Sequence, residues 1–258
     1  MPNAFLGKTN EAMKTKHHYD CNALMRLLSL HSDTGTNKKE FGRYSDVEHR
    51  MGMGTLEIRK IAKETVPSLD VALCLWNQNT YESRVLGILI CPPDEATPKL
   101  VEKWLRETQS WAICDLIAND LISKNNTLSL NIKTWSVQEE LYVKRGALSA
   151  IACRAQDLTE LPGKSFDKFA KILWRASDDG RKHIKTACSW AIKELGKIDV
   201  PNKARAIALS EKMTLDPNKI RNWIGKDALK ELKTLIKVTE RPRLISSNSS
   251  VGKKYMEQ

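Results

Sequence analysis

The sequence predicts an all-α fold, and three observations support this prediction. Long segments place apolar residues at the 3.6-residue period of a helix, and almost none shows the strict alternation of a strand. Gly and Pro are scarce, with 12 and 9 positions in 258 residues. The stretch between Pro98 and Pro162 contains no Pro at all. A chain of this length can bury the core of one large domain or two small ones.

Breaker residues delimit the predicted helices in chain order. A loop is expected at residues 32–37 (SDTGTN), and a helix is expected to begin near Thr55, a candidate N-cap. Later turns are predicted at residues 91–94 (CPPD), 161–163 (LPG) and 200–202 (VPN). The end of the chain is polar. We therefore expect one helical domain over residues 1–240 and a basic, flexible tail over residues 241–258.

Several helical segments resemble one another. Residues 81–90 can be laid on residues 142–151 and on the segment that begins at His183, with offsets of 61 and 41 residues. The first offset leaves room for one more unit, which residues 110–115 fill. Irregular repeats of helix pairs indicate an α-solenoid of HEAT-like helical repeats. Such a stack has a concave face, and that face is expected to bind the partner.

The positive charge is concentrated near the C-terminus. Residues 159–258 hold 22 Lys and Arg against 12 Asp and Glu, a net charge of +10, whereas residues 1–158 hold 20 against 19, a net charge of +1. This asymmetry favours a polyanion as partner, with nucleic acid ahead of anionic lipid. A solvated basic surface without a partner remains the alternative at this point.

Several function classes are poorly supported by the sequence. No apolar run approaches the ~18–20 residues of a transmembrane helix, and residues 1–16 lack the apolar segment of a signal peptide. Nucleotide-binding and zinc-protease motifs are missing, so we expect neither cofactor nor metal. No CxxC pair occurs among the six cysteines, several of which lie among apolar residues and indicate buried free thiols. We infer a reducing, intracellular compartment.

The sharpest signal is a set of residues that lie off the apolar stripe of their own helices. At 100° per residue, Trp190 lies roughly 140° from the stripe of its helix, and Trp111 and Asp115 lie roughly 140–180° from theirs. Trp111 and Asp115 are four residues apart and therefore share a helix face. Arg145 lies opposite the stripe of a third helix. Each Trp could instead pack on a neighbouring repeat, and Asp115 with Arg145 could form a solvated ion pair.

These residues resemble a known family, the alkylpurine DNA glycosylases built from HEAT-like repeats, or AlkD-like DNA alkylation repair enzymes. The resemblance covers roughly residues 40–235. The order and spacing of several short motifs carry it, namely Gly52 with Thr55 and Arg59, Leu75 with Trp76, Ser110 with Trp111 and Asp115, Arg145, and Ala187 with Trp190 and Lys193. Tyr44 matches a family Tyr more weakly, because the local spacing differs by one residue.

The resemblance implies that Trp111, Asp115 and Trp190 line the cleft that receives the damaged nucleotide. It also implies that Arg145 contacts the DNA backbone, and Lys193 and Tyr44 are carried over as DNA-binding residues. A purine alkylated at N3 or N7 is cationic and leaves as a neutral base, so one carboxylate between aromatic faces suffices for its excision. Asp115 would oppose the oxocarbenium ion and orient water, while each Trp face would contribute ~0.5–2 kcal/mol.

The sequence therefore predicts a monomeric DNA glycosylase, a hydrolase of base excision repair that acts on alkylated purines in double-stranded DNA. It would lie in the cytoplasm of a bacterium or the nucleus of a eukaryote, with no membrane partner. One alternative is a non-catalytic protein of the same fold that binds damaged or branched DNA, and a second is a protein-interaction scaffold. The other tryptophans, Trp76, Trp104, Trp135, Trp174 and Trp223, are expected to be structural.

Overall fold

The computed structural model describes residues 16–30 and 49–257, in which helices predominate and one two-stranded sheet occurs. The helices are α1 (Cys21–Leu30), α3 (Thr55–Glu64), α4 (Leu69–Asn77), α5 (Tyr81–Ile90), α6 (Pro98–Glu107), α7 (Trp111–Ile117), α8 (Asn126–Ser129), α9 (Ile132–Trp135), α10 (Leu141–Gln156), α11 (Gly163–Ala176), α12 (Lys182–Gly196), α13 (Val200–Leu215), α14 (Lys219–Leu232) and α15 (Ser250–Met256). Shorter elements are the 3-10 turn η1 (Pro93–Glu95), the π-turn η2 (Ala118–Ile122), β1 (Leu235–Ile236) and β2 (Ile245–Ser246).

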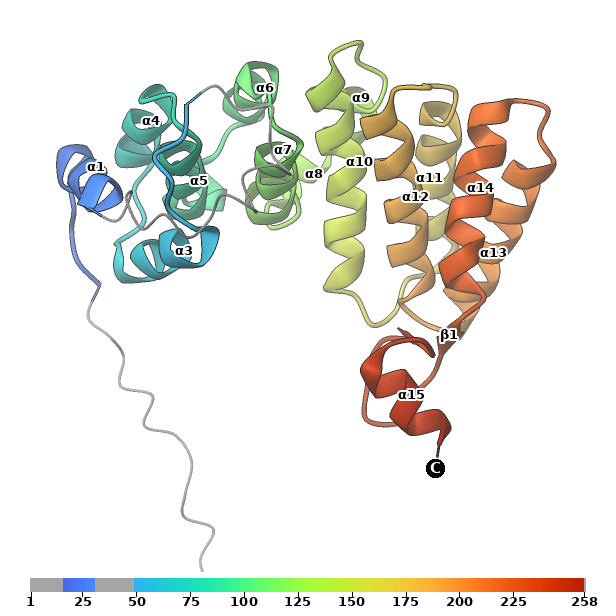
Figure 1. Ribbon diagram of the computed structural model, residues 1–258. Helices are drawn as coiled ribbons and strands as arrows, with labels where there is room; N and C mark the ends of the chain where they lie inside the picture. The colour runs from blue at the N-terminus through green and yellow to red at the C-terminus, as the bar shows by residue number, and fades with distance from the viewer. Residues whose placement is uncertain (1–15, 31–48, 258) are drawn as a thin grey trace, which may run out of the picture.

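The helices pack in two rows. Row A consists of α3, α5, α7, α10, α12 and α14, and each of these helices contacts the next. Row B consists of α4, α6, α9, α11 and α13, and each packs on the row A helix that follows it in the chain. Figure 1 shows α10, α12 and α14 side by side, with α11 and α13 behind them. The segments that the sequence pairs as repeats are α5, α7, α10 and α12, which are neighbours in row A.

Side-chain caps fix the starts of two row A helices that matter for the site. The Ser110 hydroxyl accepts a hydrogen bond from the backbone N–H of Ala112 at 3.2 Å, so α7 begins at Trp111. The Asn218 side chain accepts from two backbone N–H groups at the start of α14. The predicted cap at Thr55 is wrong, because Gly54 is the N-cap of α3 and no side chain caps that helix.

A continuous apolar core runs between the two rows. Trp76, Trp104 and Trp135 are buried in it, and the rings of the first two stack with centroids 4.5 Å apart. The indole N–H groups of Trp76 and Trp135 donate to the carboxylates of Glu107 and Glu102. These three tryptophans are structural, as predicted. Among the described helices, none is both long and apolar enough to cross a membrane.

The helix that begins at Trp111 does not end as an ordinary α-helix. It continues from Ile117 into the π-turn η2, whose backbone closes with a hydrogen bond from Ser123 N–H to Ala118 O at 2.9 Å. Turns of this kind are rare and are often found near functional sites. Here the turn lies directly after the segment that carries Trp111 and Asp115.

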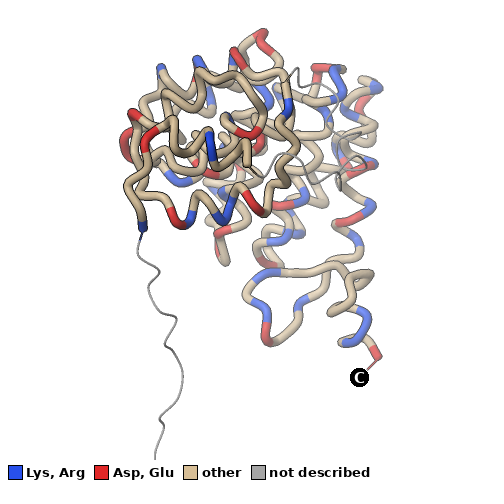
Figure 2. Tube along the Cα trace, turned by 60° about the vertical axis from the view of Figure 1, so that its left-hand side comes forward, with Lys and Arg blue, Asp and Glu red and all other residues tan. Residues whose placement is uncertain are grey.

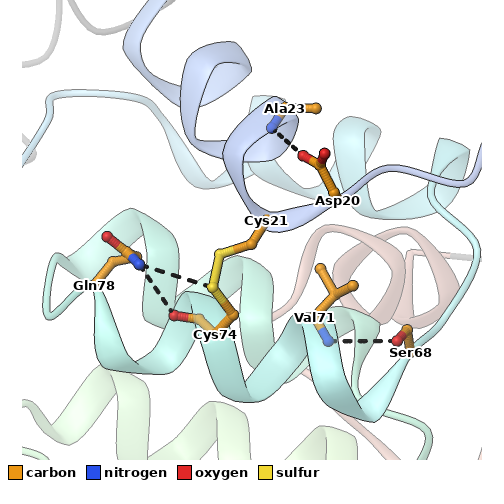
Figure 3. The surroundings of a disulfide bond; sticks show 7 residues. All are labelled: Asp20, Cys21, Ala23, Ser68, Val71, Cys74 and Gln78. Carbon is orange, nitrogen blue, oxygen red and sulfur yellow. Dashed lines mark hydrogen bonds between the residues drawn. A yellow bond between two sulfur atoms is a disulfide. The ribbon is translucent and has the colours of Figure 1, made fainter.

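A disulfide joins the first helix to the solenoid. Cys21, at the start of α1, is bonded to Cys74 of α4, as Figure 3 shows. The other four cysteines are free and buried. The sequence predicts buried free thiols, and this holds for those four but not for this pair. A separation of 53 residues gives no sequence signal that α1 packs on α4.

The C-terminal segment packs on the end of the solenoid. Strand β2 pairs antiparallel with β1, and Leu235 lies opposite Ser246. Leu244 is buried and donates its N–H to Lys197 O at 2.8 Å, and Arg243 contacts the Glu194 carboxylate at 3.0 Å. The sequence predicts a flexible tail from residue 241, whereas the structure places a strand, an ion pair and a helix there. Sparse apolar residues such as Leu244 are enough to anchor a segment against a preformed surface.

Candidate functional site

Asp115 is held in a fixed position by two side chains of the next row A helix. The Arg145 guanidinium donates from Nε to Oδ1 at 3.0 Å and from Nη2 to Oδ2 at 2.7 Å, a bidentate ion pair. The Ser149 hydroxyl donates to Oδ1 at 2.7 Å. Arg145 and Ser149 are four residues apart on α10, so both face α7. The carboxylate is 19% exposed and therefore remains within reach of solvent or a ligand.

Arg145 ties three consecutive helices together. Besides its contacts with Asp115 on α7, it donates from Nη1 to the backbone carbonyl of His183 on α12 at 2.6 Å. Its guanidinium carbon lies 5.8 Å from the centroid of the Trp111 ring. The residue is only 6% exposed. The sequence predicts that Arg145 contacts the DNA backbone, but in the structure its donors serve Asp115 and α12 rather than an open surface.

Trp111 and Trp190 differ from the buried tryptophans of the core. Both are half-buried, and they come from α7 and α12, on either side of the helix that carries Arg145. Trp190 packs partly against the apolar core. Trp111 is not among the residues packed on that core, as the helical pattern of the sequence predicts. For both residues, contact with a damaged nucleotide stays a prediction.

Lys193 is engaged in a second carboxylate cluster. Its ammonium lies 2.7 Å from Oδ2 of Asp227 on α14, and the Ser189 hydroxyl donates to the same oxygen at 2.6 Å. Burial raises the pKa of Asp227, but the hydrogen bonds from Lys193 and Ser189 outweigh this effect and hold the pKa below its usual value. Lys193 keeps 19% of its side chain exposed and remains a predicted DNA contact.

Sequence reasoning missed several members of these clusters. Ser149 and Ser189 gave no signal beyond their spacing from a basic residue, whereas Asp227 follows Trp223 at the same interval at which Asp115 follows Trp111. That repeated interval could have identified the second cluster. Tyr44 lies outside the described residues, so its proposed contact with DNA also stays a prediction.

The cysteines near the site are unsuited to nucleophilic chemistry. Burial raises the pKa of the Cys114 thiol well above its usual value and raises that of Cys188 to about 12. Both thiols therefore remain protonated at neutral pH and serve as packing groups. Within residues 16–30 and 49–257, no group of three or more His, Cys, Asp or Glu side chains is arranged to hold a metal ion.

Lys and Arg occur along the row A helices near the C-terminal end. Figure 2 marks Lys and Arg in blue along the Cα trace, including those of the C-terminal helices. Several of them are already paired with carboxylates, as Lys144 is with Asp179 at 2.9 Å and Lys193 is with Asp227. These lysines are therefore held in defined places by carboxylates of neighbouring segments.

This chain is similar to known proteins in both sequence and architecture. The family described as DNA alkylation repair enzyme matches residues 24–232. A solved member of a protein family related to the HEAT-like repeat DNA glycosylases, with affinity for branched DNA structures, has a TM-score of 0.68 and 13% sequence identity, covering 93% of this chain and 95% of that chain. A designed armadillo repeat protein has a TM-score of 0.38 and 14% identity, covering 79% and 98%, which is too weak to carry an argument. No curated protein matches the chain.

The structural similarity confirms the predicted α-solenoid of HEAT-like helical repeats. The family match spans the row A helices from α3 to α14, which carry Trp111, Asp115, Arg145 and Trp190. This match over most of the chain establishes what the motifs of the sequence suggested: the chain belongs to the DNA alkylation repair enzyme family.

Proposed function

We propose that the protein is a DNA glycosylase that hydrolyses the N-glycosidic bond of cationic N3- or N7-alkylated purines in double-stranded DNA. The observation that carries the proposal is the fixed position of Asp115, held by Arg145 and Ser149 beside the half-buried Trp111. All these groups come from one chain, so a monomer would suffice.

The chemistry needs little more than this arrangement. When water attacks C1′ of the deoxyribose, the C1′–N9 bond breaks and its electron pair neutralises the positive charge of the base. The leaving group therefore needs no general acid. A carboxylate oxygen of Asp115 would stabilise the oxocarbenium-like sugar and take up the proton of the attacking water. Trp111 and Trp190 would offer aromatic faces to the same cation.

Arg145 would act on this reaction by positioning Asp115. A bidentate guanidinium fixes both carboxylate oxygens in one plane, and Ser149 fixes one of them a second time. The carboxylate then needs no reorganisation when charge develops on the sugar. Direct contact between Arg145 and phosphate would first require the ion pair with Asp115 to break. We therefore assign the phosphate contacts to lysines that are more exposed than Arg145, such as Lys193.

The test is release of free base from a duplex that contains 7-methylguanine, measured in a single turnover at saturating enzyme. We expect the parent protein to release the base and Asp115→Asn to do so far more slowly. Asp167→Asn is a matched control, because Asp167 is an exposed carboxylate on α11 in row B. A parental rate for Asp115→Asn would remove Asp115 from the mechanism.

One observation favours a second candidate, a non-catalytic DNA-binding protein. The ion pair with Arg145 offsets the negative charge of Asp115, and this weakens its opposition to a cationic sugar. The similar solved structure comes from a family with affinity for branched DNA structures. If the parent protein binds DNA but releases no base from duplexes with 7-methylguanine or 3-methyladenine, this second function is the better one.

A further inference from the structure

Helix α14 carries a second aromatic and carboxylate pair with the spacing of the candidate site. Trp223 and Asp227 are four residues apart, as Trp111 and Asp115 are on α7, and both helices belong to row A. The structure differs from the sequence-based expectation that Trp223 is structural, because this residue is 38% exposed. An exposed Trp is not unusual by itself, so the case for a ligand rests on the charged groups around this ring.

The partners of this pair form one stripe on α12. Lys185, Ser189 and Lys193 are spaced four residues apart and therefore face α14 together. The Lys185 ammonium lies 4.4 Å from the centroid of the Trp223 ring, and Ser189 and Lys193 both hydrogen-bond Asp227. Trp190, a residue of the predicted lesion site, belongs to the same helix, α12.

The positive charge of the cluster favours an anionic ligand. Lys226 and Lys230 are exposed on the same helix as Trp223 and Asp227, and Lys230 acts electrostatically on Asp227, so α12 and α14 together supply four lysines to this region. A cationic ligand would be repelled, and Lys185 already supplies a cation to the ring. An anionic ligand with a flat apolar face satisfies both features, since its anion pairs with the lysines and its ring stacks on Trp223. A nucleotide has this chemistry.

We propose that Trp223, with Lys185 and Lys193, forms a second nucleotide-binding site that takes an unpaired nucleotide of the DNA. The proposal rests on DNA binding as part of the proposed function, but it does not require base excision. Stacking on Trp223 needs a base whose face is not covered by its neighbours, which the interior of a paired duplex does not offer. The lysines contact phosphate in either form of DNA, so only the ring distinguishes the two.

The test compares two fluorescently labelled DNAs of the same duplex sequence, one blunt and one with a short single-stranded overhang. Affinity is measured by anisotropy at a fixed salt concentration. We expect Trp223→Ala to weaken binding of the overhang DNA by about 10-fold or more and binding of the blunt duplex by less than about twofold. Trp223→Phe should retain most of the difference, because the aromatic face remains.

Two further variants and one control variant sharpen the test. Trp223→Leu keeps an apolar side chain without a ring, so it should behave as the Ala variant does and replaces it if that variant fails to fold. Lys185→Ala should weaken binding of both DNAs to a similar extent and reduce the salt dependence. Lys168→Ala, an exposed lysine of α11 in row B, is the control that should change neither.

The outcomes separate this proposal from the proposed function. If the parent protein binds both DNAs but Trp223→Ala weakens them equally or not at all, the second site is refuted while glycosylase activity is unaffected by the result. If the parent binds neither DNA at low salt, DNA binding itself fails and both proposals fall. Loss of excision in Asp115→Asn, measured separately, bears only on the catalytic site.

Discussion

Helices α7 and α14 present the same pair of residues to a neighbouring helix, yet they hold the carboxylate differently. Asp115 accepts from a guanidinium through both oxygens, and the arginine is 6% exposed. Asp227 accepts from Lys193 and Ser189 through a single oxygen, and its side chain is 29% exposed. A planar guanidinium fixes a carboxylate plane, whereas an ammonium is a point charge that does not. The cation on the neighbouring helix, which follows α7 but precedes α14, therefore determines how rigidly the carboxylate is held.

The largest expected difference concerns stability. Arg145→Ala leaves Asp115 without its partner between two packed helices and should lower the free energy of unfolding by about 3 kcal/mol. Lys193→Ala should cost about 1 kcal/mol or less, because both groups of that pair reach solvent. Urea denaturation followed by circular dichroism measures both, with Arg175→Ala, an exposed residue of α11, as the control. Equal losses of unfolding free energy for the two variants would show that the Arg145 pair stabilises the fold no more than the Lys193 pair does.

The next largest difference concerns catalysis. Asp115→Asn should slow single-turnover excision by about 10²–10³, the scale for one preorganised electrostatic group. Asp227→Asn should slow it by less than about tenfold, because that carboxylate holds Lys193 and does not face the reacting sugar in the proposed mechanism. Quantifying released 7-methylguanine at saturating enzyme gives both rates. A larger effect for Asp227→Asn would reverse the assignment of the two clusters.

Replacing the glycines next to the two clusters by Ala should also change stability to different extents. A Cβ at Gly225 would lie 2.8 Å from Thr214 N and closer still to Ser210 O, both backbone atoms of α13. Gly225→Ala should therefore destabilise the fold by about 1–3 kcal/mol. A Cβ at Gly146 would lie 2.8 Å from Cδ2 of Leu105, the end of a flexible side chain, and 3.6 Å from the sulfur of Cys114. Gly146→Ala should be nearly neutral, because the gain in helix propensity offsets the contact. Thermal melting curves would reveal the contrast, and a stable Gly225→Ala protein would contradict the observed packing.

The smallest expected effect is a dependence of stability on acid. The folded pKa of Asp227 lies below that of an unfolded Asp, about 3.9. Its contribution to stability is therefore complete above that value and is lost as the pH falls through the lower folded pKa. Asp227→Asn should remove this part of the acid sensitivity, less than about 1 kcal/mol. Urea midpoints between pH 5 and pH 2, for the parent and the variant, would detect it, and identical pH profiles would argue against the Lys193 pair.

The helical pattern predicted much of the fold and part of the site. The period of 3.6 residues gave the row A helices and placed Trp111, Asp115 and Trp190 off the apolar stripe. It could not give the burial of Arg145, because a stripe identifies only one buried side of a helix. In the interior of row A, α10 is covered by α7 on one flank and α12 on the other. A residue opposite the stripe can thus be buried between neighbours, and only the packing of the rows reveals it.

Contacts between segments far apart in the sequence could not be predicted from the sequence either. The spacing of Cys21 and Cys74 contains no signal of their bond, and the polar composition after residue 241 hides the buried Leu244. The interval from Trp223 to Asp227 was visible in the sequence, but a Trp on an amphipathic helix is usually packed inside. Its 38% exposure is visible only in the structure.

Cys21 and Cys74 are 53 residues apart in sequence, and the bond between them closes the intervening chain into a covalent ring. A protease that cuts once anywhere inside this ring produces two pieces that remain joined. On a denaturing gel without reductant the nicked protein would migrate as one species, and with reductant as two. Cleavage there cannot by itself detach α1 from α4. Release of the first helix would require an electron donor as well as a protease.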